Sequence, residues 1–204
     1  LPAARVPELA RFERIRLVRS MPRLREELDL TAALTRKFPT LVLPASRLTA
    51  PGPRVAVFDG GTQNAFGAHV VELAASGLPP ATLADLAHGV NVTSALLFGP
   101  VDPSHTALPA PPWMVEHHRV LPTNDSPEQA LDVLDRIVTA LRIARTADRP
   151  YRFANISLGP VATFFDDDIH EWTSRLDTEL ADGRTLCTAA VGNNGALDGE
   201  LGRI

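Results

Sequence analysis

Two segments of the sequence carry residue types that could perform acid–base chemistry. Asp59 ends the apolar run VAVF and is followed by two glycines, and His88 lies 29 residues later, in front of Gly89 and an apolar stretch of small residues. A carboxylate next to an imidazole is a common arrangement for general acid–base catalysis. Taken alone, Asp59 is more often a turn former or helix cap, and a lone histidine is more often a capped or solvated structural residue.

Two later segments carry groups that could bind a substrate. Ser157, Leu158 and Gly159 end an apolar run, where open backbone groups can pair with an extended peptide. Asn193 follows Gly192 after the apolar run TAAV, and its uncharged amide could donate to a developing oxyanion. Taken alone, each of these segments also fits a simple turn at the end of a strand.

In this order, the four segments resemble the motifs of the subtilisin-like (subtilase, S8) serine peptidases. That family has an Asp after an apolar strand, then His-Gly opening a buried helix, then Ser-Leu-Gly, Ala-Gly-Asn and finally Gly-Thr-Ser-x-Ala. The first four are matched by FDGG, HGVNV, SLGP and AVGNNG. A single motif would be weak, whereas four in the family's order are specific.

The resemblance implies a role for each matched residue in peptide-bond hydrolysis by an Asp/His/Ser triad. Asp59 would orient the His88 ring, and His88 would act first as general base and then as general acid. Asn193 would donate its side-chain amide to the oxyanion. The substrate-binding residues implied by the family are Ser157, Leu158, Gly159, Ala190 and Gly192. The expected partner is a polypeptide substrate.

The sequence departs from the family pattern in a minor way at Asn91 and Val191, and more strongly at two other places. Gly60 stands where the family usually has Thr or Ser, so a supporting hydroxyl near Asp59 is lost. No Gly-Thr-Ser-x-Ala occurs around any serine of the chain. The serines are Ser20, Ser46, Ser76, Ser94, Ser104, Ser126, Ser157 and Ser174. We therefore expect the front part of a subtilase domain, truncated before its nucleophile and inactive alone. The alternative is a catalytically dead subtilase-fold module that binds peptides.

The elements that must position these residues follow from an alternation of short apolar runs and amphipathic helices. This pattern predicts a three-layer α/β fold with a mainly parallel sheet, helices on both faces, and an incomplete subtilisin-like topology. The predicted strands are 54–58, 118–122, 153–158 and 185–191. The predicted helices are 126–144, 168–181 and one opened by His88. Because functional groups collect at the carboxyl ends of parallel strands, Asp59 is expected there.

The first 50 residues differ from the rest, with many Arg and Glu and a terminal linker, PASRLTAPGP. We expect 1–50 to be a helical N-terminal extension of unknown role and 51–204 to be the partial peptidase domain. A sheet truncated in this way leaves an edge strand open, so self-association through that edge is expected.

Composition excludes several classes of protein. The net charge of −4 and the absence of a Lys/Arg cluster argue against nucleic acid binding, and no apolar run is long enough to cross a membrane. Cys187 is the only cysteine, so no intrachain disulfide can form; this favours a reducing compartment and leans towards the cytoplasm. The missing initiator Met leaves open a signal peptide removed earlier.

Two other classes of protein share single features with this sequence. A metal-dependent hydrolase would use His88, His105, His117, His118 and the acidic run at 164–170. However, His117 and His118 are adjacent and would face opposite sides of a strand, and no pair has an established ligand spacing. A nucleotide-binding fold is prompted by Gly60 and Gly61, but no G-x-G-x-x-G or P-loop follows. No cofactor is expected, and calcium binding is left open.

Overall fold

The computed structural model describes residues 23–24, 42–45, 52–101, 107–121, 128–158, 160–161 and 169–190. Most of the predicted extension 1–50 lies outside these ranges, so the division into two parts stays a prediction. Three of the predicted site residues also lie outside the described residues, namely Gly159, Gly192 and Asn193.

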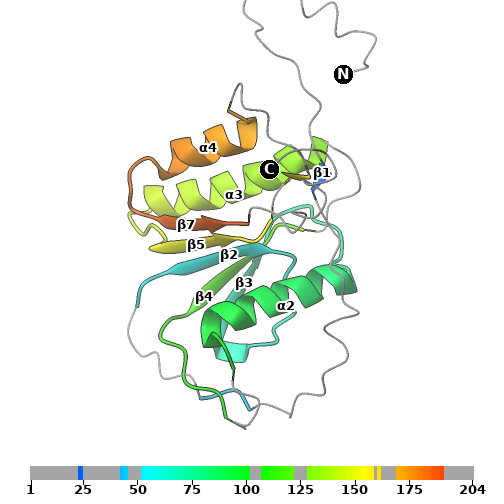
Figure 1. Cartoon of the computed structure of the whole chain (residues 1–204), viewed down its shortest axis with the longest axis vertical. Coiled ribbons are helices and arrows are strands. Elements are labelled where there is room, and N and C mark those ends of the chain that lie inside the picture. The colour runs from blue at the N-terminus through cyan, green and yellow to red at the C-terminus, as the bar shows by residue number, and fades with distance from the viewer. Residues whose placement is uncertain are drawn as a thin grey trace, which may run out of the picture.

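The described part of the chain is built on a five-stranded sheet with the order β3-β4-β2-β5-β7 (Figure 1). Every neighbouring pair in this sheet is parallel. The strands are β2 (Val55–Asp59), β3 (Val70–Ala74), β4 (Val115–Arg119), β5 (Phe153–Ile156) and β7 (Leu186–Ala189). All five residues of the central strand β2 are buried, as expected for a parallel strand covered on both faces.

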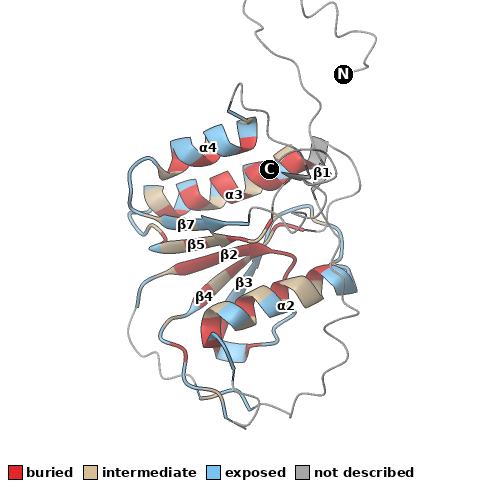
Figure 2. Ribbon diagram, viewed as in Figure 1, coloured by how far each residue is buried: buried red, intermediate tan, exposed pale blue. Residues whose placement is uncertain are grey.

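Helices cover both faces of the sheet. Figure 1 shows α2 (Leu83–Phe98) on one side and α3 (Glu128–Thr146) with α4 (Glu171–Leu180) on the other. The side chains of β2 alternate between two cores: Ala56 and Phe58 pack with α3 and α4, whereas Val55 and Val57 pack with α2. Figure 2 shows this buried layer running through the sheet. The predicted three-layer α/β arrangement is therefore confirmed.

Three short elements complete the described structure. They are β1 (Arg23–Leu24), β6 (Pro160–Val161) and the 3-10 helix η2 (Gly67–His69). Strands β1 and β6 pair antiparallel as a separate small sheet.

Two strands differ from the sequence prediction. The strand predicted at 118–122 begins three residues earlier, at Val115, and ends at Arg119. Its first half was missed because it contains polar side chains. His117 is fully buried there through hydrogen bonds and not through apolar character. Strand β3 was not predicted, because Glu72 interrupts its apolar residues and four of its five residues are exposed at the edge of the sheet.

Helix α2 begins at Leu83, so the prediction that His88 opens the helix is wrong. The helix starts at a capping box that sequence reasoning missed. Thr82 Oγ1 accepts from the Asp85 backbone N–H at 3.1 Å, and Asp85 Oδ2 accepts from the Thr82 backbone N–H at 3.0 Å. His88 therefore lies in the second turn, where the helix is already rigid.

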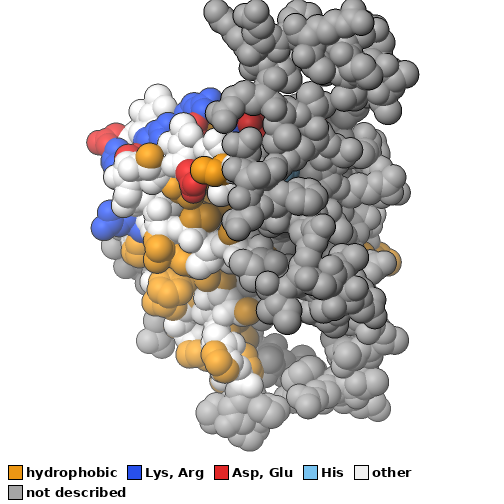
Figure 3. All heavy atoms as spheres, turned by 45° about the horizontal axis from the view of Figure 1, so that its top comes forward, with side chains coloured by type: hydrophobic (Ala, Val, Ile, Leu, Met, Phe, Trp, Pro, Cys, Tyr) orange, Lys and Arg blue, Asp and Glu red, His pale blue; other side chains and the backbone are white. Residues whose placement is uncertain are grey.

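Strand β7 confirms most of the strand predicted at 185–191, and most of its residues are exposed at the sheet edge. Leu186, for example, is 67% exposed. The neighbouring Cys187 is half-buried, and this burial raises the pKa of its thiol to about 11, so the thiol stays protonated at neutral pH. Hydrophobic side chains gather on part of the described surface in Figure 3. Self-association through the β7 edge stays a prediction.

Among the described residues, no helix has the length and apolar character needed to cross a bilayer.

Candidate active site

The register of the central strands brings three predicted site residues to one edge of the sheet. Phe58 is paired with Ile156, and Ile156 with Ala189. The next residues along β2, β5 and β7 are Asp59, Ser157 and Ala190, and the Ala190 N–H still donates to the Ile156 carbonyl at 2.9 Å. These three residues therefore lie along the carboxyl edge, where α/β sheets bind ligands.

Asp59 and His88 are in direct contact. The Nδ1 atom of His88 lies 2.7 Å from Oδ1 of Asp59. The Asp59 side chain is completely buried, whereas the His88 side chain is 25% exposed. Because a carboxylate can only accept, Nδ1 carries the proton in this bond. The neutral ring then keeps the lone pair of Nε2, on its other side, as a site for an incoming proton.

This contact changes the acid–base behaviour of His88. The hydrogen bond to Asp59 raises the His88 pKa above its ordinary value of 6.5, and this outweighs the lowering effect of burial. The negative charges of Asp59 and Asp85 act in the same direction as the hydrogen bond. The site therefore stabilises an imidazolium, which is what a general base becomes after it has taken a proton.

The raised pKa predicts how the stability of the chain depends on pH through His88. A group with a raised folded pKa stabilises the fold fully below its unfolded pKa, and this contribution is lost as pH rises through the folded pKa. We expect the loss of unfolding free energy in His88→Gln to be larger at pH 5.5 than at pH 9. Urea unfolding of both chains at the two pH values measures it. Equal losses at both pH values would contradict the raised pKa.

Helix α2 packs against the loop after Asp59 through glycines. A Cβ added at Gly60 would lie 2.5 Å from both the Cβ and the carbonyl oxygen of Asp85. A Cβ added at Gly89 would lie 2.2 Å from the carbonyl oxygen of Gly61. Only glycine lets the backbones approach this closely. This close approach holds the helix residue His88 against the strand residue Asp59.

The packing at Gly60 explains why a glycine stands at this position. In this backbone no Thr or Ser fits at position 60, because its Cβ would overlap Asp85. The Gly60 backbone N–H instead donates to Asp59 Oδ1 at 2.7 Å, so Oδ1 accepts two bonds. Oδ2 is buried and has no hydrogen-bond partner among the described residues.

Sequence reasoning missed the residues that anchor the loop after Asp59. Thr62 is almost fully buried, and its backbone N–H and hydroxyl both donate to Glu72 Oε2 at 2.8 Å. Burial would raise the pKa of Glu72, but the Thr62 bonds outweigh it, so the pKa is lowered and the carboxylate stays charged. Glu72 belongs to the unpredicted strand β3, so no signal in the sequence placed it beside this loop.

The adjacent histidines of β4 face opposite sides of the sheet, as expected. His117 faces α2 and contacts Gly61 and Thr93. His118 faces the other layer, where it contacts the Tyr151 hydroxyl at 2.8 Å and stacks on Phe58. Within the described ranges, no three His, Cys, Asp or Glu side chains come together to hold a metal ion. His105 and residues 164–168 lie outside the described residues.

The predicted substrate-binding residues are described only in part. The Ser157 hydroxyl accepts from Asn155 Nδ2 at 2.8 Å, and the Ala190 side chain is exposed. The Leu158 side chain is packed in the core, so only its backbone is free to meet a substrate. Whether these residues bind a peptide stays a prediction.

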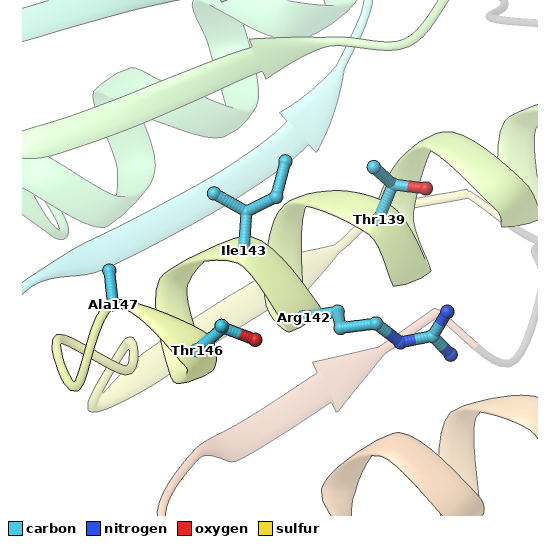
Figure 4. Close-up of a pocket in the computed structure, with 5 residues that line it drawn as sticks. All are labelled: Thr139, Arg142, Ile143, Thr146 and Ala147. Carbon is cyan, nitrogen blue, oxygen red and sulfur yellow. The ribbon is translucent and has the colours of Figure 1, made fainter.

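A separate hollow lies on the outer surface of α3, away from Asp59 and His88. It is lined by Thr139, Arg142, Ile143, Thr146 and Ala147, which follow one another along the helix in Figure 4. Helix α3 ends near the amino ends of the strands. Just beyond the helix, the backbone carbonyl of Arg149 accepts a hydrogen bond from the guanidinium of Arg54, which precedes β2. The hollow is therefore a feature of the helix surface and takes no part in the site.

Comparisons with known proteins find a likeness among solved structures. No family model matches the sequence, and no curated protein matches it. A solved structure of a mutant of the protease domain of PatA is similar at 25% sequence identity, with a TM-score of 0.47. The match covers 70% of this chain and 50% of that chain, so this chain spans about half the length of that protease domain. The α/β architecture described above rests on the strand order and layers of the chain itself.

Proposed function

We propose that this chain supplies the acid and base of a subtilisin-like serine endopeptidase. The contact between buried Asp59 and His88 at the carboxyl edge of the sheet is the observation that carries the proposal. It is supported by the order of the four motifs along the chain and by the raised pKa of His88. The nucleophilic serine is proposed to lie in sequence of the parent protein beyond these 204 residues.

The chemistry follows from the tautomer of His88. Nε2 would take the proton of the serine hydroxyl as its oxygen attacks the scissile carbonyl, and His88 would then give that proton to the leaving amine. Asp59 would stay ionised and stabilise the imidazolium formed between the two steps. The Asn193 amide would stabilise the tetrahedral oxyanion. The backbone of residues 157–159 would pair with the extended substrate.

Labelling with a fluorophosphonate tests this proposal, because the reagent reacts with a serine that a neighbouring base has activated. We expect no labelling of the 204-residue chain and rapid labelling of the complete product of the parent gene. In that product, His88→Ala should slow labelling by at least about 10³-fold, because the base is lost.

Two results would contradict the proposal. Labelling of the 204-residue chain would mean that a serine within it is activated. Absence of labelling in a folded complete product would favour the alternative, a subtilase-fold module that binds peptides without cutting them. Fluorescence anisotropy with a labelled peptide library would then measure that binding.

A further inference from the structure

His117 is a fully buried histidine placed between the two elements that carry Asp59 and His88. Its Nε2 atom lies 3.0 Å from the backbone nitrogen of Gly61, in the loop after Asp59. Its Nδ1 atom lies 2.9 Å from the hydroxyl of Thr93, which follows His88 by five residues along α2. His117 and Thr93 are both 0% exposed. One ring therefore bridges the loop and the helix.

The two bonds fix the tautomer of His117. A backbone N–H can only donate, so Nε2 must accept from Gly61 and carry no proton. In the neutral ring the proton is then on Nδ1, which donates to Thr93 Oγ1. His117 therefore differs from His88. Both ring nitrogens of His117 are used for internal hydrogen bonds, so neither is free for catalysis.

The bridge acts at the point where the helix and the loop touch. The backbone of Gly61 packs closely against Gly89, which directly follows His88 in α2. Gly61 has a positive φ of 110°, a conformation that an internal hydrogen bond helps to hold. A shift of this loop would move the backbone that follows Asp59 relative to the helix that carries the base.

We propose that His117 is a positioning residue for the Asp59–His88 pair, tying the loop after the acid to the helix of the base through Gly61 and Thr93. This inference rests on the proposed function, since it gives that site a third, non-catalytic histidine. The implied family motifs assign His117 no role.

The charge state of His117 is consistent with this task. Burial lowers its pKa, although the charges of Asp59 on β2 and Glu72 on β3 act in the opposite direction. The neighbouring α2 contributes Asp85 and His88 to the same region. A protonated ring would set an Nε2–H against the Gly61 N–H, so the neutral form is the one that holds the loop.

The test measures the His88 pKa by NMR titration of the histidine rings in the 204-residue chain. In His117→Leu both bonds are lost, and in Thr93→Val only the bond to the helix is lost. We expect the His88 pKa to fall towards 6.5 in both variants, because Nδ1 and the Asp59 carboxylate are no longer held together. His117→Gln, whose amide oxygen can still accept from Gly61, should retain more of the raised pKa than His117→Leu.

His118→Gln is the matched control, because this neighbouring, partly buried histidine faces the opposite layer and should leave the His88 pKa unchanged. A purely structural role would lower the melting temperature of His117→Leu and Thr93→Val without moving the His88 pKa, and that result would overturn the inference. If His117→Leu does not fold, the near-isosteric Thr93→Val decides. The His88 pKa is measured without the nucleophilic serine. The result therefore tests the role of His117 even if the fluorophosphonate test contradicts the proposed function.

Discussion

Under the proposed function, Asp59→Ala is expected to lower the rate of peptide hydrolysis by the complete parent protein about 10⁴-fold, the size of loss known for the acid of Asp/His/Ser triads. The variant removes the acceptor of the His88 Nδ1–H bond and the negative charge that stabilises the imidazolium. It also removes the acceptor of the Gly60 N–H, which loosens the loop. Turnover of a fluorogenic peptide, measured as kcat/KM, reports the effect.

Asp59→Asn separates the bond from the charge. Oδ1 accepts both hydrogen bonds of this carboxylate, and Oδ2 accepts none within the described residues. An amide with its oxygen at the Oδ1 position can therefore keep the tautomer of His88 while the negative charge is lost and an NH2 group replaces Oδ2. We expect a smaller loss of kcat/KM than in Asp59→Ala. Equal losses would assign the whole effect to the charge.

The control for both variants is Asp132→Ala, which removes an exposed carboxylate from α3 on the opposite layer. Its kcat/KM should match that of the unchanged protein. Asp59 would have no part in the site if Asp59→Ala retained activity within about tenfold.

The layers of the fold could be predicted because its central strands are buried on both faces. Such strands form continuous apolar runs, as β2 does, and the amphipathic helix α3 follows from its spacing of apolar residues. The edge strands do not follow this rule. Strand β3 was missed because it is exposed and Glu72 interrupts its apolar residues, whereas β7 was predicted as a strand from its apolar run although most of its residues are exposed.

The acid and the base could be predicted from residue type, position and order, but the geometry between them could not. Nothing local to His117 distinguishes it from its neighbour His118, and only the pairing of β4 with β2 brings it to Gly61. Likewise, Gly60 reads as the loss of a hydroxyl until the approach of Asp85 makes the glycine necessary. Contacts between distant segments carry this information, and a single sequence does not display them.

Gly89→Ala is expected to destabilise the chain, although alanine is the better helix former. In an open helix the exchange would raise the unfolding free energy by about 1 kcal/mol. Here the new Cβ would lie 2.2 Å from the Gly61 carbonyl oxygen and 2.9 Å from its nitrogen. Both are backbone atoms, so no side chain can rotate away. We expect a net loss of about 3 kcal/mol in urea unfolding, at the upper end of overpacking effects.

The sign of this change is the informative part, and Asn91→Ala is its matched control. Asn91 lies two residues further along α2 and is exposed, so alanine there should raise stability by a few tenths of a kcal/mol. In Gly89→Ala the helix must instead move away from the loop, which lengthens the bond between His88 Nδ1 and Asp59 Oδ1. The His88 pKa should then fall towards its ordinary value together with the stability. A Gly89→Ala chain as stable as Asn91→Ala, with the His88 pKa still raised, would mean that helix and loop do not meet as closely as described. Because the same contact sets both measurements, the two must change together or not at all.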